Sequence, residues 1–96
     1  MKIDGRPEFD WDANNIAHLA RHGVSPIEFE QAIMKDSVFM DVRDESGEDR
    51  WYALGATEKL RVLFLIYTYR GDRIRPVTAW DAGKKLRKVY FRSRAT

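Results

Sequence analysis

Apolar residues in the first third of the chain recur at helical spacing. Between residues 12 and 22, Ile16, Leu19 and Ala20 lie three or four positions apart and would share one face of a helix. The same spacing returns over residues 25–34, so the sequence predicts two consecutive helices. The apolar face of the second helix would consist of Phe29, Ala32 and Ile33.

Residues with strong positional preferences mark the ends of both helices. Asp12 is suited to cap the first helix, because its carboxylate can accept a hydrogen bond from a free backbone N–H. Gly23 suits the left-handed turn that ends a helix. Ser25 and Glu28 have the spacing of a capping box, and Pro26 fits the first position of the second helix. The link between the helices is therefore short, and we expect a compact corner.

From residue 37 onward the spacing changes to the alternation that is typical of β-strands. The strand 61–69 is apolar on both faces, which predicts a central strand covered on both sides. Pro76 cannot donate to a strand ladder, so its strand should lie at an edge or carry a bulge. A last helix is expected over residues 81–96, with Asp81 as its cap. The four predicted strands cover residues 37–44, 50–57, 61–69 and 73–80.

These elements predict an α+β fold in a single domain, residues 1–96. Two N-terminal helices would precede a four-stranded antiparallel sheet, and one C-terminal helix would follow it. The short connections favour antiparallel pairing, because parallel neighbours need long crossovers. A chain of 96 residues has room for one modest hydrophobic core.

The composition excludes several classes of protein. The chain has no cysteine, which rules out disulfide scaffolds, thiolate zinc sites and cysteine nucleophiles. Its apolar fraction of 44% and charged fraction of 33% are those of a folded, soluble protein. No apolar run is long enough to span a membrane, and the first residues lack the pattern of a signal peptide. We therefore expect a cytoplasmic protein that does not contact membranes.

The formal net charge of +2 hides a strong asymmetry. Residues 1–49 carry a formal charge of −7, and residues 50–96 carry +9. A basic half on a small domain suggests that the partner is a polyanion or an acidic surface on another protein, provided that the positive charge gathers on one surface. The alternative is that the two halves neutralise each other across the fold.

The chain has two histidines, His18 and His22, which lie four residues apart. On a helix both imidazoles would project from one face, where such a pair can chelate a metal ion. Leu19 stands where a zincin motif would have its glutamate, so we favour an interpretation without metal. In that interpretation His18 is a half-buried helix residue, and His22 interacts with the last carbonyl groups of the helix.

Basic and aromatic residues are interleaved in the second half of the chain. Arg73 and Arg75 lie two apart and share one face of their strand. Arg61 and Tyr67 likewise share one face of the preceding strand. Guanidinium groups bind phosphate and a ring such as Trp80 can stack on a base, as in RNA recognition; the alternative is a solvated surface with the rings in the core. The last helix would add Lys84, Lys85, Arg87 and Lys88.

Cleavage of RNA by attack of its 2′-hydroxyl needs a base, an acid and positive charge at the phosphate. Arginine and lysine supply the charge. Because no histidine lies in the basic half, Tyr67, Lys85 or a carboxylate would have to transfer the protons.

Three segments together resemble the BrnT family of bacterial toxins. They are "FDWDANNIAHLARHGVSPIEFEQA", Arg50 with "LGAT", and "RVLFLIYTYRGDRIRPVTA". The chain is similar to a variant with the spacing of Asn15 and His18, and the resemblance covers nearly its whole length. It implies a RelE-like fold and an endoribonuclease that cuts RNA without a metal or cofactor and inhibits translation. It also implies a cognate ribbon-helix-helix antitoxin of the BrnA kind, with a heterotetramer as a possible assembly.

The resemblance also implies a basic face on the sheet, near the corner at His22. Our first hypothesis is a toxin in which Arg73 and Arg75 hold the phosphate. Tyr67 or Lys85 would transfer the protons. The supporting arginines would be Arg61 and Arg70, and further RNA contacts would come from His22, Arg50, Arg70, Trp80, Lys84, Arg87 and Lys88.

The chain departs from the family pattern at two positions. Trp80 stands where the family often has arginine, and Leu86 stands where it often has an acidic residue. These departures favour a second hypothesis, a non-catalytic module that binds RNA or an antitoxin and has lost cleavage. The overall similarity favours the first hypothesis.

Overall fold

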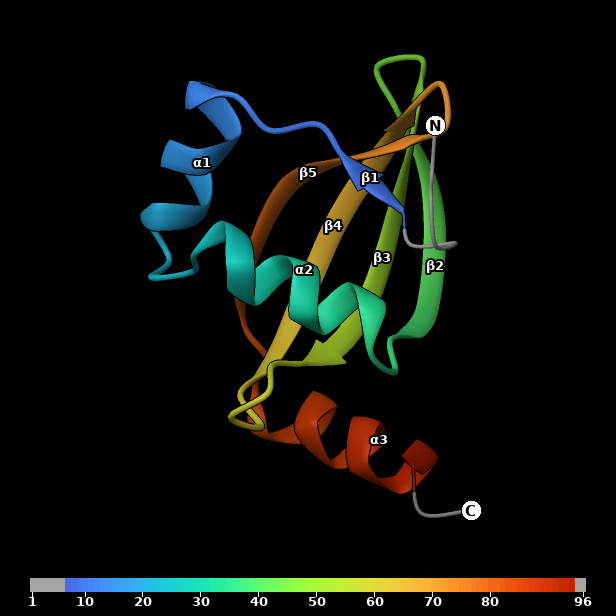
Figure 1. The fold of residues 1–96 in the computed structure, drawn as a ribbon. Helices are drawn as coiled ribbons and strands as arrows, with labels where there is room; N and C mark the ends of the chain where they lie inside the picture. Colours follow the sequence, from blue (N-terminus) through green and yellow to red (C-terminus); the bar gives the residue numbers. More distant parts are fainter. Residues whose placement is uncertain (1–6, 95–96) are drawn as a thin grey trace.

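Residues 7–94 are described by a computed structural model, in which they form one five-stranded sheet and three helices (Figure 1). The two helices before the main strands and the helix after them confirm the predicted order. The elements are β1 (Glu8–Phe9), α1 (Ala13–Ala20), α2 (Pro26–Met34), β2 (Val38–Glu45), β3 (Glu48–Ala56), β4 (Val62–Arg70), β5 (Arg73–Asp81) and α3 (Lys84–Arg94).

The sheet has the strand order β1-β5-β4-β3-β2. Strands β2 to β5 pair antiparallel, as predicted. The prediction of a purely antiparallel, four-stranded sheet was wrong, because β1 adds a fifth strand parallel to β5. Only Glu8 and Phe9 take part in this pairing, opposite Arg73 and Ile74. Two residues are too few to produce a recognisable alternation, so the sequence pattern missed this strand.

Strand β4 lies at the centre of the sheet, and seven of its nine residues are buried or half-buried, which confirms the prediction from its apolar faces. Strand β5 carries the bulge that Pro76 indicated. Ile66 of β4 pairs with Thr78 of β5, whereas the next residue, Tyr67, pairs with Pro76. Val77 is therefore the extra residue of the bulge.

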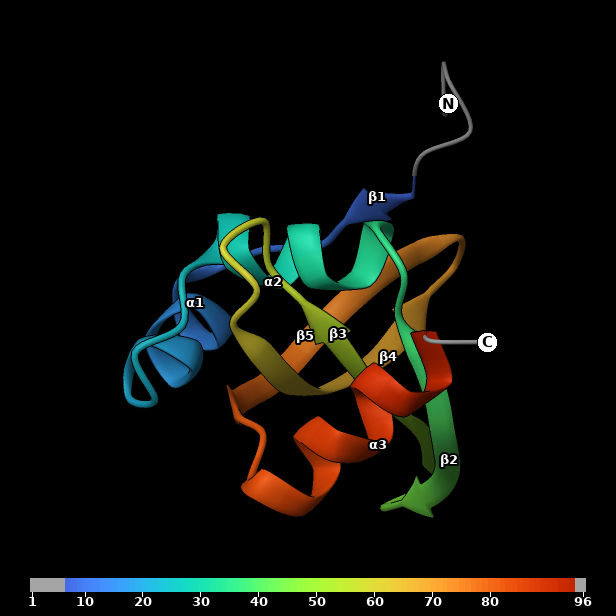
Figure 2. The same cartoon turned by 90° about the horizontal axis from the view of Figure 1, so that it is seen from below.

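The sheet separates α2 from α3, as Figure 2 shows. On one side, Phe29 and Ala32 of α2 pack in one buried cluster with Leu63 and Leu65 of β4, and we call this side the α2 face. On the other side, which we call the α3 face, Tyr90 of α3 packs with residues of β3 and β4. Alternation assigns the residues of each strand to one face or the other. The core residues on the α3 face include Leu54, Ala56 and Val62.

The helix ends follow the predicted chemistry in α1 and α2. Asp12 and Ser25 each form a capping box, and Pro26 begins α2. Gly23 has a φ of 69° in the turn between the helices. The expected start of the last helix was wrong: Asp81 is the last residue of β5, and α3 begins at Lys84. Residues 95–96 of the predicted helix lie outside the described residues.

Candidate active site

A pocket of about 220 Å³ lies on the α3 face, at the end of the sheet that α3 does not cover. It combines side chains of α1, β3, β4 and β5. Its chemical groups are one imidazole, one carboxylate, three guanidinium groups and two amides. The lining residues are Asn14, Asn15, His18, Glu48, Arg50, Thr68, Arg70, Arg75, Pro76 and Val77.

Strand register explains why these residues meet. Thr68 of β4 pairs with Arg75 of β5, so their side chains share a face. The pairing of β3 with β4 is regular, and the alternation along β3 brings Arg50 to the same face as Leu54. The Thr68 hydroxyl donates a 2.8 Å hydrogen bond to the carbonyl of Asp49 and so ties β4 to β3 beside the pocket.

Helix α1 closes the pocket along β5. Asn14 and His18 are four residues apart and therefore lie on one side of the helix. Asn15 is buried and fixes the helix: its side-chain N–H groups donate to the carbonyls of Asp10 (2.9 Å) and Pro76 (3.1 Å). The Asn15 amide thus ties α1 to the bulge of β5. This attachment fixes the position of α1, and with it the position of His18 beside the pocket.

Arg75 is the most enclosed arginine of the pocket, with a side chain that is 17% exposed. Its Nη2 lies 2.9 Å from Oδ2 of Asp12, and its Nη1 lies 3.7 Å from Oδ2 of Asp10. The hydrogen bond from the Asn15 backbone N–H, together with Arg75, lowers the pKa of Asp12 below its ordinary value. Asp12 is therefore ionised at neutral pH and orients the guanidinium.

Glu48 provides the only carboxylate that lines the pocket, within the part of the chain that the structure describes. It lies between two arginines, with Oε1 3.8 Å from Nε of Arg50 and Oε2 3.7 Å from Nε of Arg70. Both separations exceed hydrogen-bond length, so these ion pairs are loose. An incoming phosphate can therefore compete with Glu48 for both guanidinium groups.

The histidines are placed differently from the sequence interpretation. His18 is exposed and lines the pocket, so the expectation of a half-buried helix residue was wrong. His22 contacts the ring of Trp80, with the ring centroids 5.7 Å apart. His18 lies on α1 and His22 in the turn that follows it, and the two side chains reach different neighbours. His18 is thus the histidine that meets the arginines.

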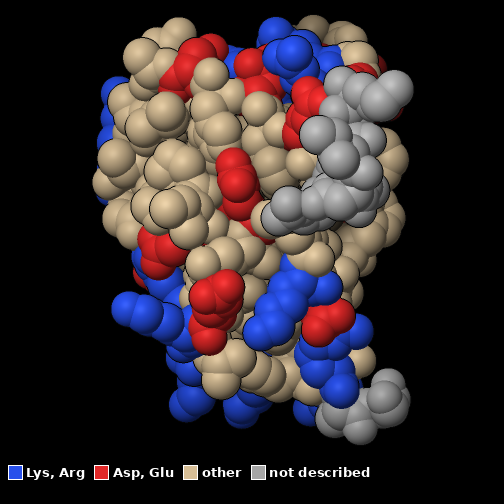
Figure 3. All heavy atoms as spheres, in the orientation of Figure 1, with Lys and Arg blue, Asp and Glu red and all other residues tan. Residues whose placement is uncertain are grey.

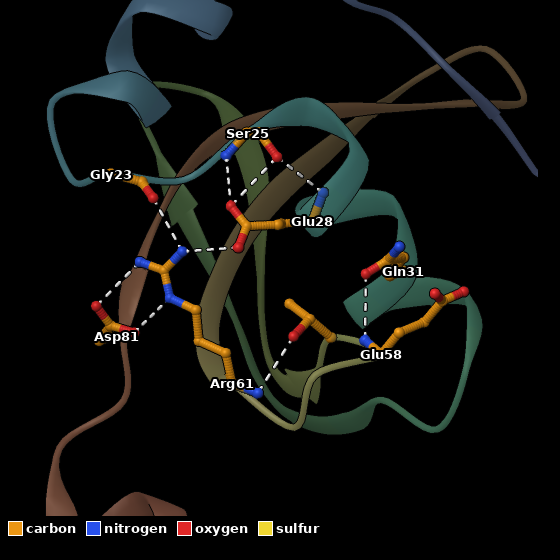
Figure 4. Close-up of polar contacts among 8 residues, drawn as sticks. Gly23, Ser25, Glu28, Gln31, Glu58, Arg61 and Asp81 are labelled. Atoms are coloured by element: carbon orange, nitrogen blue, oxygen red, sulfur yellow. Dashed lines mark hydrogen bonds and ion pairs between the residues drawn. The ribbon is translucent and has the colours of Figure 1, made fainter.

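Arg61 lies outside the pocket, in a polar network of its own (Figure 4). Its Nε and Nη2 donate to the two carboxylate oxygens of Asp81, at 2.7 and 3.0 Å. Its Nη1 donates to Glu28 and to the carbonyl of Gly23, both at 2.9 Å. The bonds to Asp81 and Glu28 raise the pKa of Arg61. These contacts join the corner between α1 and α2 to the end of β5, which is a structural role.

Tyr67 lies on the other face of the sheet from Arg75. It belongs to the buried cluster around α2 and is 9% exposed. Burial, reinforced by its interaction with Tyr69, raises the pKa of Tyr67 to about 12. A phenol that is buried and protonated at neutral pH on the α2 face has no access to the pocket. The structure therefore does not bring Tyr67 together with the arginines.

The remaining predicted residues fall into four places. Arg50 and Arg70 line the pocket. Arg73 pairs with Arg70 across the strands but lies outside the lining, 3.5 Å from Glu8. Trp80 lies near the α1 corner, where it contacts His22. Lys84, Lys85, Arg87 and Lys88 are exposed on α3.

The positive charge of the second half does not form one continuous surface. Five arginines of the sheet and its loops pair with carboxylates, as the neutralisation alternative expected. The basic residues of α3 have no ion pair within residues 7–94, and Figure 3 shows basic side chains gathered at the end of the molecule where α3 lies. The five pairings are Arg50 and Arg70 with Glu48, Arg73 with Glu8, Arg75 with Asp10 and Asp12, and Arg61 with Glu28 and Asp81.

Two pocket residues with proton-transfer chemistry were missed from the sequence. The signal for His18 was its helical spacing from Asn14, which predicts a shared side of α1. The signal for Glu48 was its position two residues before Arg50, which predicts a shared strand face. Neither signal indicates that residues of α1 and β3 line the same pocket.

Two further features concern membranes and metals. None of the helices in the described range is long and apolar enough to cross a bilayer. Within residues 7–94, no three histidine or carboxylate side chains gather in an arrangement that could hold a metal ion.

A comparison with known protein families covers the segments that resemble the BrnT family in the sequence. No curated protein matches the chain. A family model described as "Ribonuclease toxin, BrnT, of type II toxin-antitoxin system" matches residues 11–85, from the residue before the α1 cap to the first turn of α3. The match includes every residue that lines the pocket. The chain therefore belongs to the BrnT family of ribonuclease toxins of type II toxin–antitoxin systems.

Proposed function

We propose that this chain is an endoribonuclease that cleaves RNA in the pocket between α1 and the sheet, without a metal ion, and thereby inhibits translation in the cytoplasm. Membership of a ribonuclease toxin family supports the reaction class. The pocket supports the location, because it is where an imidazole and a carboxylate meet three guanidinium groups.

The chemistry is an attack of the 2′-hydroxyl of RNA on the adjacent phosphorus. A base removes the proton of the 2′-hydroxyl, the new P–O bond forms, and the bond to the 5′-oxygen breaks. An acid delivers a proton to that oxygen, which leaves as a 5′-hydroxyl, and the other product carries a 2′,3′-cyclic phosphate. Histidine is suited to such transfers because it changes charge at physiological pH. His18 and Glu48 are the two groups that we assign to proton transfer.

The arginines stabilise the negative charge that grows on the phosphate during this attack. Arg75 is held in place by Asp12, so it does not need to reorganise when the charge appears. Arg50 and Arg70 can exchange their loose pairing with Glu48 for contacts to the phosphate oxygens. That exchange also releases the Glu48 carboxylate, which can then accept a proton.

The observation that carries this proposal is the placement of His18 and Arg75 in one pocket, on opposite sides of the contact between α1 and β5. A proton-transfer group and a half-buried guanidinium from distant parts of the sequence converge there. Asn15 and Asp12 fix that convergence through bonds to Pro76 and Arg75.

Cleavage of an end-labelled RNA by purified protein in the presence of a chelator tests the proposal. We expect wild type to produce fragments that end in a 2′,3′-cyclic phosphate. His18→Ala should lose most of this activity, because the proton-transfer group is gone. Arg21→Ala is the control, because Arg21 is an exposed residue at the end of α1 that does not line the pocket. The proposal fails if His18→Ala cuts as well as Arg21→Ala, or if the chelator abolishes cleavage by wild type.

A second candidate function is a module that binds RNA or antitoxin without cutting. The pairing of every pocket arginine with a carboxylate favours it, as do the departures at Trp80 and Leu86. The same assay distinguishes the two candidates. A wild-type protein that shifts RNA in a gel but leaves it intact would support the second candidate and reject the first.

The partner that the family implies is an antitoxin. We propose that it is a ribbon-helix-helix protein that assembles with this chain into a heterotetramer. Co-expression with the adjacent open reading frame and light scattering of the purified complex test this. A complex that contains one copy of each chain would contradict the heterotetramer, and an adjacent reading frame of another fold would contradict the ribbon-helix-helix assignment.

A further inference from the structure

Four aromatic rings form a continuous row across the α3 face. The rings are those of His22, Trp80, Phe64 and Tyr52, and we call them the ring row. Neighbouring ring centroids lie 5.7 Å apart from His22 to Trp80, 5.3 Å from Trp80 to Phe64 and 5.8 Å from Phe64 to Tyr52. The row therefore crosses from the α1 corner over β5 and β4 to β3.

The ring row lies between the pocket and α3. Along β3, Tyr52 comes after Arg50 and before Leu54, which packs in the cluster of α3. Along β4, Phe64 separates Thr68 of the pocket from Val62 of that cluster. The separation from Phe64 to Thr68 is about 13 Å along the strand, which leaves room for a short run of nucleotides. An RNA strand that leaves the pocket toward α3 must therefore pass the rings.

The outer part of the row is accessible and has the basic helix α3 on one side. Trp80 is 37% exposed, His22 is exposed, and Phe64 is half-buried. Asp81, the neighbour of Trp80, is occupied by Arg61. The basic side chains of α3 lie beyond the row and have no ion pair within the described range: Lys84, Lys85, Arg87, Lys88 and Arg92.

The inner end of the row is more polar, and its carboxylates already have partners. The Tyr52 hydroxyl donates to Glu45 at 3.2 Å, and Asp41 pairs with Arg43 at 3.1 Å. The Arg43 guanidinium lies over the Tyr52 ring, 5.2 Å from its centroid. Trp80 and Phe64 are therefore the rings with the most favourable surroundings for an anionic chain.

We propose that the ring row is a base-stacking subsite for single-stranded RNA, which it guides from the cleavage pocket toward α3. The inference rests on the proposed function and adds that the RNA substrate is single-stranded. Bases stack on aromatic rings irrespective of sequence, while basic groups on either side of the rings track the phosphates. A duplex keeps its bases stacked on one another, so the row selects unpaired RNA.

Fluorescence anisotropy of a short, unstructured, labelled RNA tests the subsite, with His18→Ala as the background that prevents cleavage. Trp80→Leu should weaken binding about tenfold, because the loss of one stacking ring has an effect of that order. Trp80→Phe keeps a ring and should retain most of the affinity. Tyr69→Leu is the matched control, because Tyr69 is an exposed ring (46%) on the α2 face, where it contacts Trp51.

Two further RNA ligands test whether the loss of affinity in Trp80→Leu comes from base stacking. An RNA with abasic sites should bind wild type and Trp80→Leu equally, since it has no bases to stack. A duplex of the same sequence should also show no difference between them. Thermal melting of each variant checks that the fold is kept.

Equal affinity of Trp80→Leu and wild type for single-stranded RNA would overturn the inference, even if wild type cleaves RNA and the proposed function stands. Loss of antitoxin binding in Trp80→Leu with unchanged RNA affinity would also overturn it, and would assign the row to a protein interface. Conversely, RNA binding that depends on Trp80, without any cleavage by wild type, would support the ring row and reject the proposed catalysis.

Discussion

Asp12 links the start of α1 to Arg75 with a single carboxylate. Its Oδ1 accepts the backbone N–H of Asn15 at 3.0 Å, and its Oδ2 lies 2.9 Å from Nη2 of Arg75. The residue that caps the helix therefore also orients the arginine of the pocket. The position of α1, which brings His18, is coupled in this way to the position of the guanidinium.

Asp12→Asn separates these two roles. Asparagine caps helices as well as aspartate does, so the melting temperature should change little. The charge that orients Arg75 is lost, and we expect RNA cleavage to fall about tenfold or more, mainly through kcat, because the guanidinium is no longer pre-positioned. Single-turnover cleavage with saturating protein measures this. Asp12→Ala, which removes the cap as well, should melt earlier than Asp12→Asn; full activity in Asp12→Asn would show that Arg75 does not depend on the carboxylate.

Arg61→Met should destabilise the fold without damaging the chemistry of the pocket. The substitution removes the guanidinium donor from Asp81, from Oε2 of Glu28 and from the carbonyl of Gly23. We expect a loss of about 2 kcal/mol in the free energy of unfolding, since each bond involves a charged group but Asp81 is well exposed and screened. Urea denaturation measures the loss, with Lys59→Met as the exposed control. A folded Arg61→Met variant that does not cleave RNA would contradict this prediction. It would support the hypothesis from the sequence that Arg61 helps to hold the phosphate.

The same network predicts how stability depends on pH. Burial opposes ionisation of Glu28, but hydrogen bonds from Ser25 and Arg61 outweigh it, so the pKa of Glu28 lies below its ordinary 4.5. Arg61 likewise lowers the pKa of Asp81 below 3.8. Carboxyl groups whose pKa is lowered by folding stabilise the fold above their unfolded pKa, and this contribution disappears as pH falls through the folded pKa.

Wild type should therefore lose more stability than Arg61→Met on acidification from about pH 5 to about pH 2. Urea denaturation of both proteins over this range gives the comparison. Parallel curves for the two proteins would mean that the network contributes nothing to the acid response.

Gly55→Ala should prevent α2 from packing on β3. A Cβ at this position would collide with the backbone carbonyl of Ala32, which cannot move without displacing the helix. Overpacking against backbone costs more stability than overpacking among side chains, because the backbone cannot relax by a change of rotamer. We therefore expect a loss of about 3 kcal/mol or more in the free energy of unfolding. Gly83→Ala is the control, since nothing lies within 4 Å of the Cβ it would add. Circular dichroism during thermal melting distinguishes the two, and equal melting temperatures would contradict the close approach of α2 to β3.

The lysines of α3 should contribute to RNA binding through charge alone. Lys84→Ala/Lys88→Ala should reduce the slope of log affinity against log salt by about 0.7 for each lysine that contacts a phosphate of a single strand. Arg21→Ala/Lys35→Ala removes two exposed cations from the ends of α1 and α2 and serves as the control. An unchanged slope in the α3 variant would place the RNA elsewhere on the surface.

The sequence alone determined the local structure. Helical spacing, Asp12, Ser25 and Gly23 set the extents of α1 and α2, because caps and turns act over a few residues. The two apolar faces of residues 61–69 marked the central strand. The motifs also indicated the BrnT family, which the family model confirms over residues 11–85.

Only the tertiary structure decided which residues share the pocket. Alternation correctly related Arg73 to Arg75, but it does not determine which face of the sheet they join, and Arg61 precedes β4 rather than belonging to it. The packing of α2 buried Tyr67 on one face, and the docking of α1 along β5 brought His18 to Arg75 on the other. These are contacts between residues far apart in the chain, and they depend on how whole elements pack rather than on any local spacing.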